Sequence, residues 1–436
     1  MMKKLLSLLL FVPFVTNAQF WTAKATTFGS PSRGVNSISI VDANNVWVKA
    51  LDGSGGAIET IKEYSKSTDG GNTWTSGAIN LGSGTTGLGI GNITAVSAST
   101  AWVSAFPATS GAGGIWKTTN GGTTWTKQTS AEFNTPNDSF TNFVHFFDVN
   151  NGVCQGDPAG GYFEIYTTSN GGTTWTRVPS VNIPATNSAA EYGYTNFYEV
   201  ASGTIWFGTA TGRLYKSTNM GLNWTVASTP LSDNLFSFSF KDATNGLIVN
   251  DSNGAMYKST DGGATWIPQT YTGTVFTGDL TFIPGTSGVV STGAATGSSG
   301  SSYSTDNGLT WVNVDIVQHL QVEFLNSTIG FTGEFNTSNS AGGISKYTGT
   351  VLSTQSFESN GLSIYPNPIN NMFTIQNENN IGINSVTIVD INGRTVKNID
   401  VSTIENEINI SDLNSGVYFL NITNDKGLAT KKIIKN

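Results

Sequence analysis

The chain has 436 residues, of which only 11% are charged, and it contains 51 glycines, 11 tryptophans and one cysteine. Low charge combined with many aromatic residues and glycines is typical of an all-β protein with many tight turns. The net charge of −8 argues against a nucleic-acid partner, and the single cysteine, Cys154, excludes an intramolecular disulfide framework.

Residues 1–18 have the pattern of a secretory signal peptide. Lys3 and Lys4 carry the positive charge, an apolar run follows, and a small-residue cleavage site ends at Ala18. We therefore expect the mature chain to begin at Gln19. The apolar run is shorter than a membrane span requires and no other stretch is long enough, so we expect no transmembrane segment.

One short motif occurs six times between residues 67 and 311. Each copy has two Ser or Thr residues, then Asp or Asn, a tight turn with a glycine, and a tryptophan three residues after that glycine. Successive tryptophans are 42 to 51 residues apart, which is the period of propeller blades. The acidic or amide position is Asp69, Asn120, Asn170, Asn219, Asp261 or Asp306. The tryptophan is Trp74, Trp125, Trp175, Trp224, Trp266 or Trp311.

We interpret the motif residues as structural. The Asp and Asn side chains accept hydrogen bonds from turn N–H groups, the glycine permits a positive φ, and the tryptophan buries its ring between neighbouring blades. Calcium binding is the alternative, but half of the six positions carry Asn and no second acid recurs nearby, so we expect no metal and no cofactor. The pattern resembles the Asp box, or BNR repeat, of sialidases, sortilin-type receptors, xyloglucanases and photosystem II assembly factors. This resemblance implies a β-propeller.

Three strands with period-two alternation precede each of the six motifs. A seventh unit begins at Leu320 and reaches Tyr347, but it lacks the motif and the strand after it. Residues 19–24 are similar to the segments that follow the motifs. We therefore predict a seven-bladed propeller over residues 19–349, in which the N-terminal strand completes the last blade and removes an exposed edge. Six blades with a separate extension are the alternative.

The sequence changes character beyond the propeller. Residues 350–360 are predicted to form a polar linker, and residues 361–436 a small C-terminal β-sandwich. Four motifs occur in order within this last segment. They are Tyr-Pro-Asn-Pro at 365–368, Asp-x-x-Gly-Arg-x-Val from Asp390, Leu-x-x-Gly-x-Tyr from Leu413, and Lys-Lys-Ile-Ile-Lys at 431–435.

The series resembles the C-terminal sorting domain of the type IX secretion system of Bacteroidetes. This resemblance implies that the secretion machinery recognises the domain at the outer membrane and that the domain is usually cleaved off after export. The mature protein is then secreted or attached to the outer-membrane surface. An ordinary sandwich with a binding role of its own is the alternative.

Catalytic residues are not indicated. Sialidases surround a substrate carboxylate with three arginines, whereas this propeller has only Arg33, Arg177 and Arg213, and Arg177 belongs to an outer strand. Xyloglucanases of this type divide acid and base between two propellers, and this chain has one. A glycosidase acting on extracellular polysaccharide stays as the alternative. Its acids would come from expected loop residues that we otherwise interpret as solvating, namely Asp52, Asp157, Glu191, Asp251, Asp279 and Glu334.

The two histidines, His145 and His319, lie near inner strands and alternate with apolar neighbours. A metal site needs more ligands at matching spacing. We therefore predict that both histidines line the channel wall or pack in the core.

One patch is a candidate ligand site. The motifs occupy one face of the predicted propeller, so the inter-blade loops and the turns between second and third strands gather on the opposite face. Blades three and four place there the residue types that bind sugars or peptides. These residues are Asp157, Tyr162, Glu191, Tyr192, Tyr194 and Arg213. Turn packing is their alternative role. We expect a monomeric, exported binding protein whose ligand is a glycan or a protein.

Overall fold

The structure is a computed structural model that describes residues 20–55, 60–133, 140–231, 236–348, 362–377, 382–390, 394–399, 408–424 and 427–436. The chain divides into two compact units, Met1–Val351 and Leu352–Asn436. The predicted signal peptide, the cleavage site at Ala18 and Gln19, and the predicted linker lie outside the described residues. The one helix of the described part is a short 3₁₀ turn, η1 (Ser180–Asn182), so no described helix is long enough to cross a membrane.

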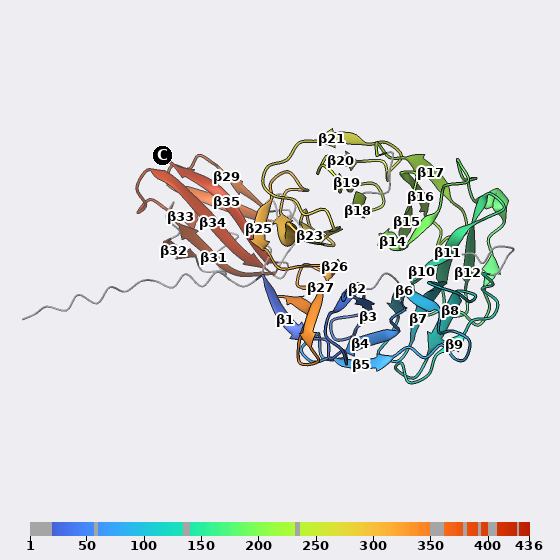
Figure 1. Cartoon of the computed structure of the whole chain (residues 1–436). Helices are drawn as coiled ribbons and strands as arrows, with labels where there is room; N and C mark the ends of the chain where they lie inside the picture. Colours follow the sequence, from blue (N-terminus) through green and yellow to red (C-terminus); the bar gives the residue numbers. More distant parts are fainter. Residues whose placement is uncertain are drawn as a thin grey trace, which may run out of the picture. The chain divides into compact units, whose positions relative to one another are not determined.

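The first unit is a propeller of antiparallel four-stranded sheets arranged in a ring (Figure 1). Blade 1 contains β2 (Arg33–Ile40), β3 (Val46–Asp52), β4 (Glu63–Ser67) and β5 (Thr75–Ala78). Blade 2 contains β6 (Leu88–Ala95), β7 (Ala101–Pro107), β8 (Gly114–Thr118) and β9 (Thr126–Lys127). Blade 3 contains β10 (Thr141–Phe146), β11 (Gly152–Ala159), β12 (Tyr162–Thr168) and β13 (Thr176–Arg177). Blade 4 contains β14 (Gly193–Ala201), β15 (Thr204–Thr209), β16 (Arg213–Ser217) and β17 (Thr225–Ser228).

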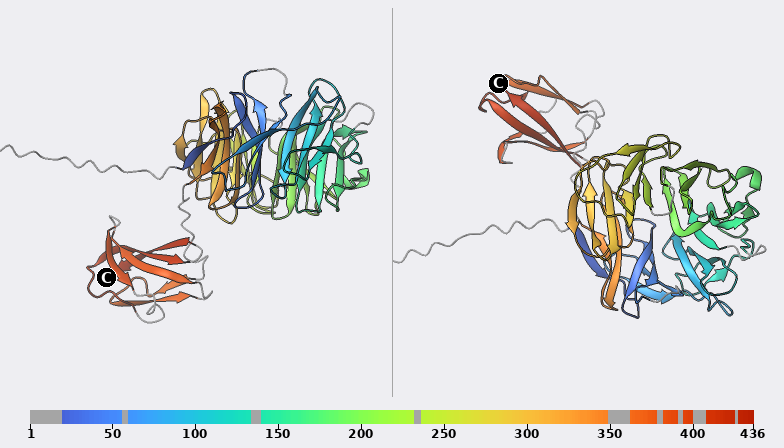
Figure 2. Two further views of the ribbon diagram at one scale, coloured as in Figure 1. Left: turned by 90° about the horizontal axis from the view of Figure 1, so that it is seen from below. Right: turned by 45° about the horizontal axis from the view of Figure 1, so that its top comes forward.

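The remaining blades continue the same order around the ring, and the strands run through its thickness (Figure 2, left). Blade 5 contains β18 (Phe236–Phe240), β19 (Gly246–Asn250), β20 (Met256–Ser259) and β21 (Ile267–Gln269). Blade 6 contains β22 (Asp279–Phe282), β23 (Val289–Ala295), β24 (Ser298–Ser304) and β25 (Val312–Asp315). Blade 7 contains β26 (Val322–Asn326), β27 (Ile329–Ser338), β28 (Ala341–Tyr347) and β1 (Trp21–Ala25).

The ring is closed by its N-terminal strand. β1 pairs antiparallel with β28, with Trp21 opposite Tyr347 and Ala25 opposite Gly343, and Figure 1 shows β1 in blue beside the orange strands of blade 7. Blades 7 and 1 are joined further by the single pair of Gly34 and Phe335. The strand pairing therefore gives seven groups of four strands, and β1 supplies the outer strand of the last group.

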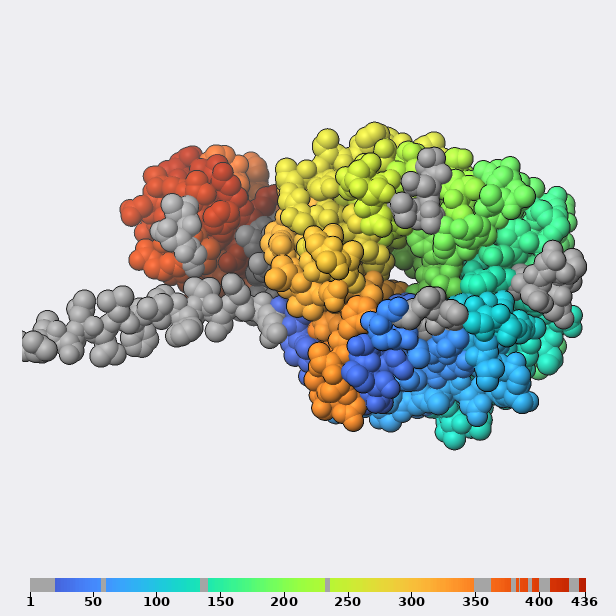
Figure 3. Space-filling model, in the orientation of Figure 1, coloured from blue at the N-terminus to red at the C-terminus, as the bar shows by residue number. Residues whose placement is uncertain are grey.

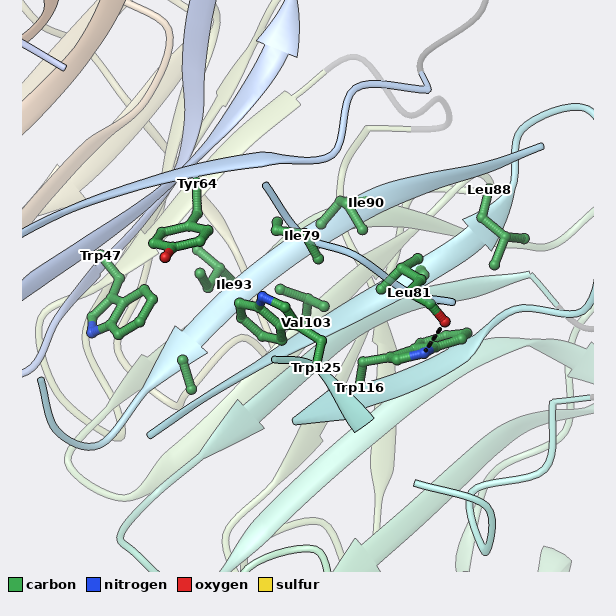
Figure 4. Close-up of a cluster of buried hydrophobic side chains, with 12 residues drawn as sticks. Trp47, Tyr64, Ile79, Leu81, Leu88, Ile90, Ile93, Val103, Trp116 and Trp125 are labelled. Carbon is green, nitrogen blue, oxygen red and sulfur yellow. Dashed lines mark hydrogen bonds between the residues drawn. The ribbon is translucent and has the colours of Figure 1, made fainter. Parts of the chain in front are cut away.

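Hydrophobic cores lie between neighbouring blades, and each repeat tryptophan packs against the blade before it. In one of these cores Trp125 of blade 2 meets Tyr64 of blade 1 with ring centroids 6.0 Å apart, and Trp47 packs beside them (Figure 4). Trp116 of the same cluster donates a hydrogen bond from its Nε1 to the carbonyl of Leu81 over 3.1 Å. The core between blades 6 and 7 uses Trp21 in the same way.

The six motif turns share one hydrogen-bond pattern. In the first, the N–H of Gly71 donates to Ser67 Oγ (2.8 Å), and the N–H of Thr73 donates to Asp69 Oδ1 (2.9 Å). Gly71 has a φ of 81°, a value that favours glycine. The corresponding two bonds recur in the other five turns. Each turn thus ties the end of a third strand to the start of the fourth.

The second unit is a two-sheet β-sandwich. One sheet contains β29 (Leu362–Tyr365), β30 (Met372–Asn377) and β33 (Ile408–Asn409). The other contains β32 (Thr395–Ile399), β31 (Ile383–Val389), β34 (Gly416–Asn424) and β35 (Gly427–Lys435). Its core consists of aliphatic side chains and one aromatic, and among the central residues are Phe373, Ile388, Leu420 and Ile433.

Loss of the closing tryptophan should destabilise the propeller. Trp21 is only 5% exposed, and its Nε1 donates to Ser301 Oγ over 2.9 Å. We expect Trp21→Ala to lower the free energy of unfolding by about 3–5 kcal/mol, the usual cost of emptying a buried tryptophan site. Denaturant titration of the full chain measures this. Lys24→Ala, on the same strand, is the control, and equal stability of the two variants would contradict the role of Trp21 in closure.

Candidate ligand-binding site

The innermost strands of all seven blades surround a central channel, which is visible as a hollow at the middle of the ring (Figure 3). The channel contains two cavities. The first, of about 310 Å³, is lined mainly by residues in the first part of innermost strands or just before them, including Asn36, Tyr194 and Asp279. We call it the mouth cavity. Because each innermost strand starts at an inter-blade loop, the mouth cavity opens on the face opposite the motif turns.

The second cavity, of about 240 Å³, lies nearer the face that carries the motif turns, and we call it the inner cavity. It is lined by later positions of β2 and by the ends of β6 and β10, including Thr94 and His145, as well as by residues of β14 and β26. Several polar side chains line both cavities and so stand between them. They are Asn196, Tyr198, Glu199, Gln321 and Glu323.

Three carboxyl groups from three blades face this channel: Glu199 of β14, Asp279 of β22 and Glu323 of β26. A carboxylate oxygen of Asp279 accepts a hydrogen bond from the N–H of Val322 over 2.9 Å, and one of Glu199 accepts from Ser239 Oγ over 3.1 Å. No described residue hydrogen-bonds the carboxyl of Glu323, and no described lysine or arginine lines either cavity. The channel therefore holds three acids without a basic counterpart among the described residues.

Burial keeps these acids protonated at pH values well above those at which Asp and Glu side chains ordinarily ionise. Burial raises the pKa of Asp279 to about 7. Burial, followed by the nearby charge of Asp279, raises the pKa of Glu323 to about 8. The pKa of Glu199 lies well above its ordinary value for the same reason, with Glu323 and Asp279 adding repulsion. Near neutral pH the three groups thus carry much less negative charge than their number suggests.

His145 and Tyr198, which also line the channel, are neutral near pH 7. Burial lowers the pKa of His145 to about 4, and its ring contacts Tyr198 with centroids 5.6 Å apart. Burial also raises the pKa of the Tyr198 hydroxyl. As predicted, His145 lines the channel wall and His319 is buried in the core. No group of three His, Cys, Asp or Glu residues in the described part of the chain is arranged to hold a metal ion.

Two further acceptors in the mouth cavity have no hydrogen-bond partner. The side-chain oxygens Asn36 Oδ1 and Gln321 Oε1 are both buried and unpaired. Unsatisfied buried acceptors are uncommon in proteins and call for an explanation. Like the carboxyl of Glu323, both can receive a hydrogen bond from a group that enters the channel.

The predicted patch on blades 3 and 4 is partly an internal network. Arg213 Nη1 donates to Glu191 Oε2 over 2.7 Å, and Thr209 Oγ1 donates to Glu191 Oε1 over 2.8 Å. The Arg213 side chain is 12% exposed and that of Glu191 is fully buried. Asp157 Oδ1 accepts from the N–H of Gly193 over 2.9 Å, and burial raises the pKa of Asp157. These bonds fix the long loop that leads into β14.

The tyrosines of the patch differ in exposure. Tyr192 is 45% exposed, whereas Tyr194 is half-buried and lines the mouth cavity. Their ring centroids are 5.2 Å apart, and their hydroxyls are 3.4 Å apart. Tyr162 packs against the core between blades 3 and 4. The structure thus brings Tyr192 and Tyr194 together at the channel mouth, and we call them the tyrosine pair.

The interpretation of the expected loop acids as solvating is wrong for four of them. Asp279 is the first residue of β22 and faces the channel, while Glu191 and Glu334 are buried. Asp157 is partly buried and hydrogen-bonded within the loop. Glu199 and Glu323 are not among the site residues predicted from the sequence. The available signal was an acid within the apolar alternation of an innermost strand, where solvation is not expected.

Comparison with known proteins agrees with this architecture. Residues 363–436 match the family model of the secretion system C-terminal sorting domain. The protein is therefore exported by type IX secretion and is released or held at the cell surface. No curated protein matches the chain.

Solved structures share the propeller fold. One, YCF48 bound to a D1 peptide, is 16% identical with a TM-score of 0.53, over 76% of this chain and 97% of that chain. YCF48 from Cyanidioschyzon merolae is 17% identical with a TM-score of 0.53, over 75% of this chain and 99% of that chain. PorZ is a surface component of the type IX secretion system of Porphyromonas gingivalis. It is 14% identical with a TM-score of 0.52, over 94% of this chain and 60% of that chain. At these identities the likeness concerns the fold alone.

The channel acids should make the protein less stable as pH rises. Folded Asp279 and Glu323 titrate at about 7 and 8, whereas the unfolded groups titrate near 4. Between about pH 4 and 8 the folded state therefore binds more protons, and stability falls with increasing pH. The depressed pKa of about 2 at Asp69 affects stability only at lower pH. Melting temperatures from pH 5 to 9 should therefore decrease.

Glu323→Gln should raise the melting temperature at pH 9 and flatten this decrease, because an amide cannot ionise. Glu132→Gln, which removes an exposed acid, is the matched control. An unchanged pH dependence in Glu323→Gln would show that this carboxyl is not the buried titrating group.

Proposed function

We propose that the exported propeller is a binding module whose ligand docks on the face opposite the motif turns and extends into the mouth cavity. The observation that carries this proposal is the position of the tyrosine pair. Tyr192 presents its ring to solvent, and Tyr194 continues the same aromatic surface into the cavity wall. A largely preformed hollow with aromatic walls and a few polar groups is the usual form of a binding site.

In this proposal the acids and the arginine of the patch support the tyrosine pair. Glu191 and Arg213 bond each other, and Asp157 bonds the backbone directly before Tyr194. Their polar atoms are thus used within the loop. Fixing the loop in advance reduces the entropy that the tyrosines lose when they bind.

A peptide is the ligand that we propose. The YCF48 propeller, which has the same fold, was solved with a D1 peptide bound, and this supports the ability of such a propeller to bind a peptide. We propose further that the six motif turns are structural Asp boxes and that the closed ring acts as a monomer, since closure leaves no unpaired strand at the blade 7 edge.

A glycosidase is the second candidate, and one observation favours it. A carboxyl with a raised pKa, such as that of Asp279 or Glu323, suits a general acid. Glycoside hydrolysis also requires an ionised carboxylate as base or nucleophile, and all three channel acids have raised pKa values. This favours binding over catalysis. If the purified protein hydrolyses a polysaccharide and Glu323→Gln abolishes this hydrolysis, the glycosidase would be preferred to the binding module.

Removal of the C-terminal unit should stop export at the outer membrane. We propose that residues 361–436 are the sorting unit, so truncation after Asn360 should leave the propeller in the periplasm with its signal peptide removed. Immunoblots of periplasm, cell surface and medium, compared with the full chain, measure this. Normal amounts of the truncated protein in the medium would place the sorting signal elsewhere.

Tyr192→Ala should weaken ligand binding without loss of stability. A ligand is first identified by screening the protein on peptide and glycan arrays. The exposed ring of Tyr192 contributes contact area, and losing an aromatic contact of about 1.4 kcal/mol weakens affinity about tenfold. Leu222→Ala, exposed on a motif turn of the opposite face, is the matched control. Weaker binding in Leu222→Ala with full affinity in Tyr192→Ala would put the ligand on the wrong face for our proposal.

A further inference from the structure

The channel is chemically selective. We propose that it receives a basic side chain, the ammonium of lysine or the guanidinium of arginine, projected by the peptide that docks on the tyrosine pair. This inference rests on the proposed binding function and adds the chemical class of the group that enters the channel.

The first argument is charge. Glu199, Asp279 and Glu323 reach the channel from three different blades, and no lysine or arginine lines the cavities in the described part of the chain. Buried carboxyls are normally paired with a basic group. The described residues of the propeller supply no such basic group in the channel, so a cation from a ligand could pair with the carboxyls.

The second argument is hydrogen bonding. Asn36 Oδ1 and Gln321 Oε1 are buried acceptors without donors, and the Glu323 carboxyl also has no described hydrogen-bond partner. All three groups offer acceptor oxygens to a molecule inside the channel. An ammonium carries three donors and no acceptor, and a guanidinium carries five. A sugar hydroxyl carries only one donor together with its acceptor lone pairs, and its neutral charge would not favour the ionised form of the carboxyls.

The third argument is shape and lining. The mouth cavity of about 310 Å³ has aromatic side chains near its polar groups, including Phe197, Tyr198 and Phe238. The alkyl stem of a lysine or arginine packs on such rings while its charged end reaches the polar groups, and aromatic faces also attract the cation. The net charge of −8 adds a long-range attraction for basic peptides.

The proton balance gives this site a measurable signature. Before binding, the channel carboxyls hold protons at neutral pH, because burial raises the pKa values of Asp279 and Glu323. An entering cation favours the ionised carboxylate, so a carboxyl O–H bond breaks and its proton passes to the buffer. The ligand keeps its own proton. Binding should therefore release protons and tighten as pH rises from 6 to 8.5.

The test uses the full chain and a set of acetylated, amidated pentapeptides in which a central residue is flanked by two glycines on each side. The central residue is lysine, arginine, norleucine or Nε-acetyl-lysine. Isothermal titration calorimetry at pH 8 should show binding of the lysine or arginine peptide at least about tenfold tighter than that of the two neutral peptides, as expected for a charge-assisted contact. The preferred basic peptide distinguishes an ammonium from a guanidinium site.

Variants then assign the effect to the channel. Asp279→Asn and Glu323→Gln should each weaken binding of the preferred basic peptide about tenfold. Proton release is measured by comparing the binding enthalpy in buffers of different ionisation enthalpy, and it should be smaller in Glu323→Gln. Both substitutions remove a buried acid that lacks a basic partner, so folding should persist, and circular dichroism confirms it. Glu132→Gln should bind like the native protein.

Equal affinity for the lysine and norleucine peptides, or no binding of any peptide in the set, would overturn the inference. A neutral ligand from the arrays that requires Tyr192 but is insensitive to Glu323→Gln would also overturn it, while leaving the proposed binding function in place. If every ligand binds Tyr192→Ala as tightly as the native protein, the proposed function itself would be contradicted.

Discussion

Burial of one tryptophan ring against the preceding sheet is the interaction on which the propeller depends. Each blade of four short strands has too little apolar surface to be stable alone, so it must cover its faces with its neighbours. The repeat tryptophan does this immediately after a turn whose hydrogen bonds fix its direction. At the last interface Trp21 takes the same place, although it comes from the opposite end of the unit.

Seven blades packed in this way leave a hollow at the axis, because their innermost strands cannot all meet there. The side chains that face the hollow are enclosed by protein, yet they are not tightly packed against one another. Acids are tolerated at these positions because they can remain protonated, as at Asp279 and Glu323. Closure of the ring thus gathers acids from several blades around one hollow, where their mutual repulsion favours protonation and an added cation would oppose it.

The fold could be predicted from the sequence because its determinants are local. The motif turns occur within eight residues, and the segment around Trp21 resembles the strands that follow them. Only part of the candidate site could be predicted from the sequence. Tyr194 could be placed at a loop by its neighbours, but Glu199 and Glu323 are far apart in sequence, and only closure of the ring brings them to the same cavities. Glu191 lies in the loop before β14, whereas Arg213, expected in a loop, is the first residue of β16, and their mutual bond depends on side-chain geometry that local patterns do not contain.

The pairing of β1 with β28 also has a kinetic consequence. Trp21 and Tyr347 are partners across almost the whole length of the unit, and a contact of such sequence separation carries a large loop-closure entropy and forms slowly. The intermediate blades can assemble on neighbours already made, whereas the first strand has no partner until the last blade exists. We therefore expect the N-terminal segment to stay unpaired until blade 7 has formed, so that the pairing of β1 with β28 is the last step of propeller folding.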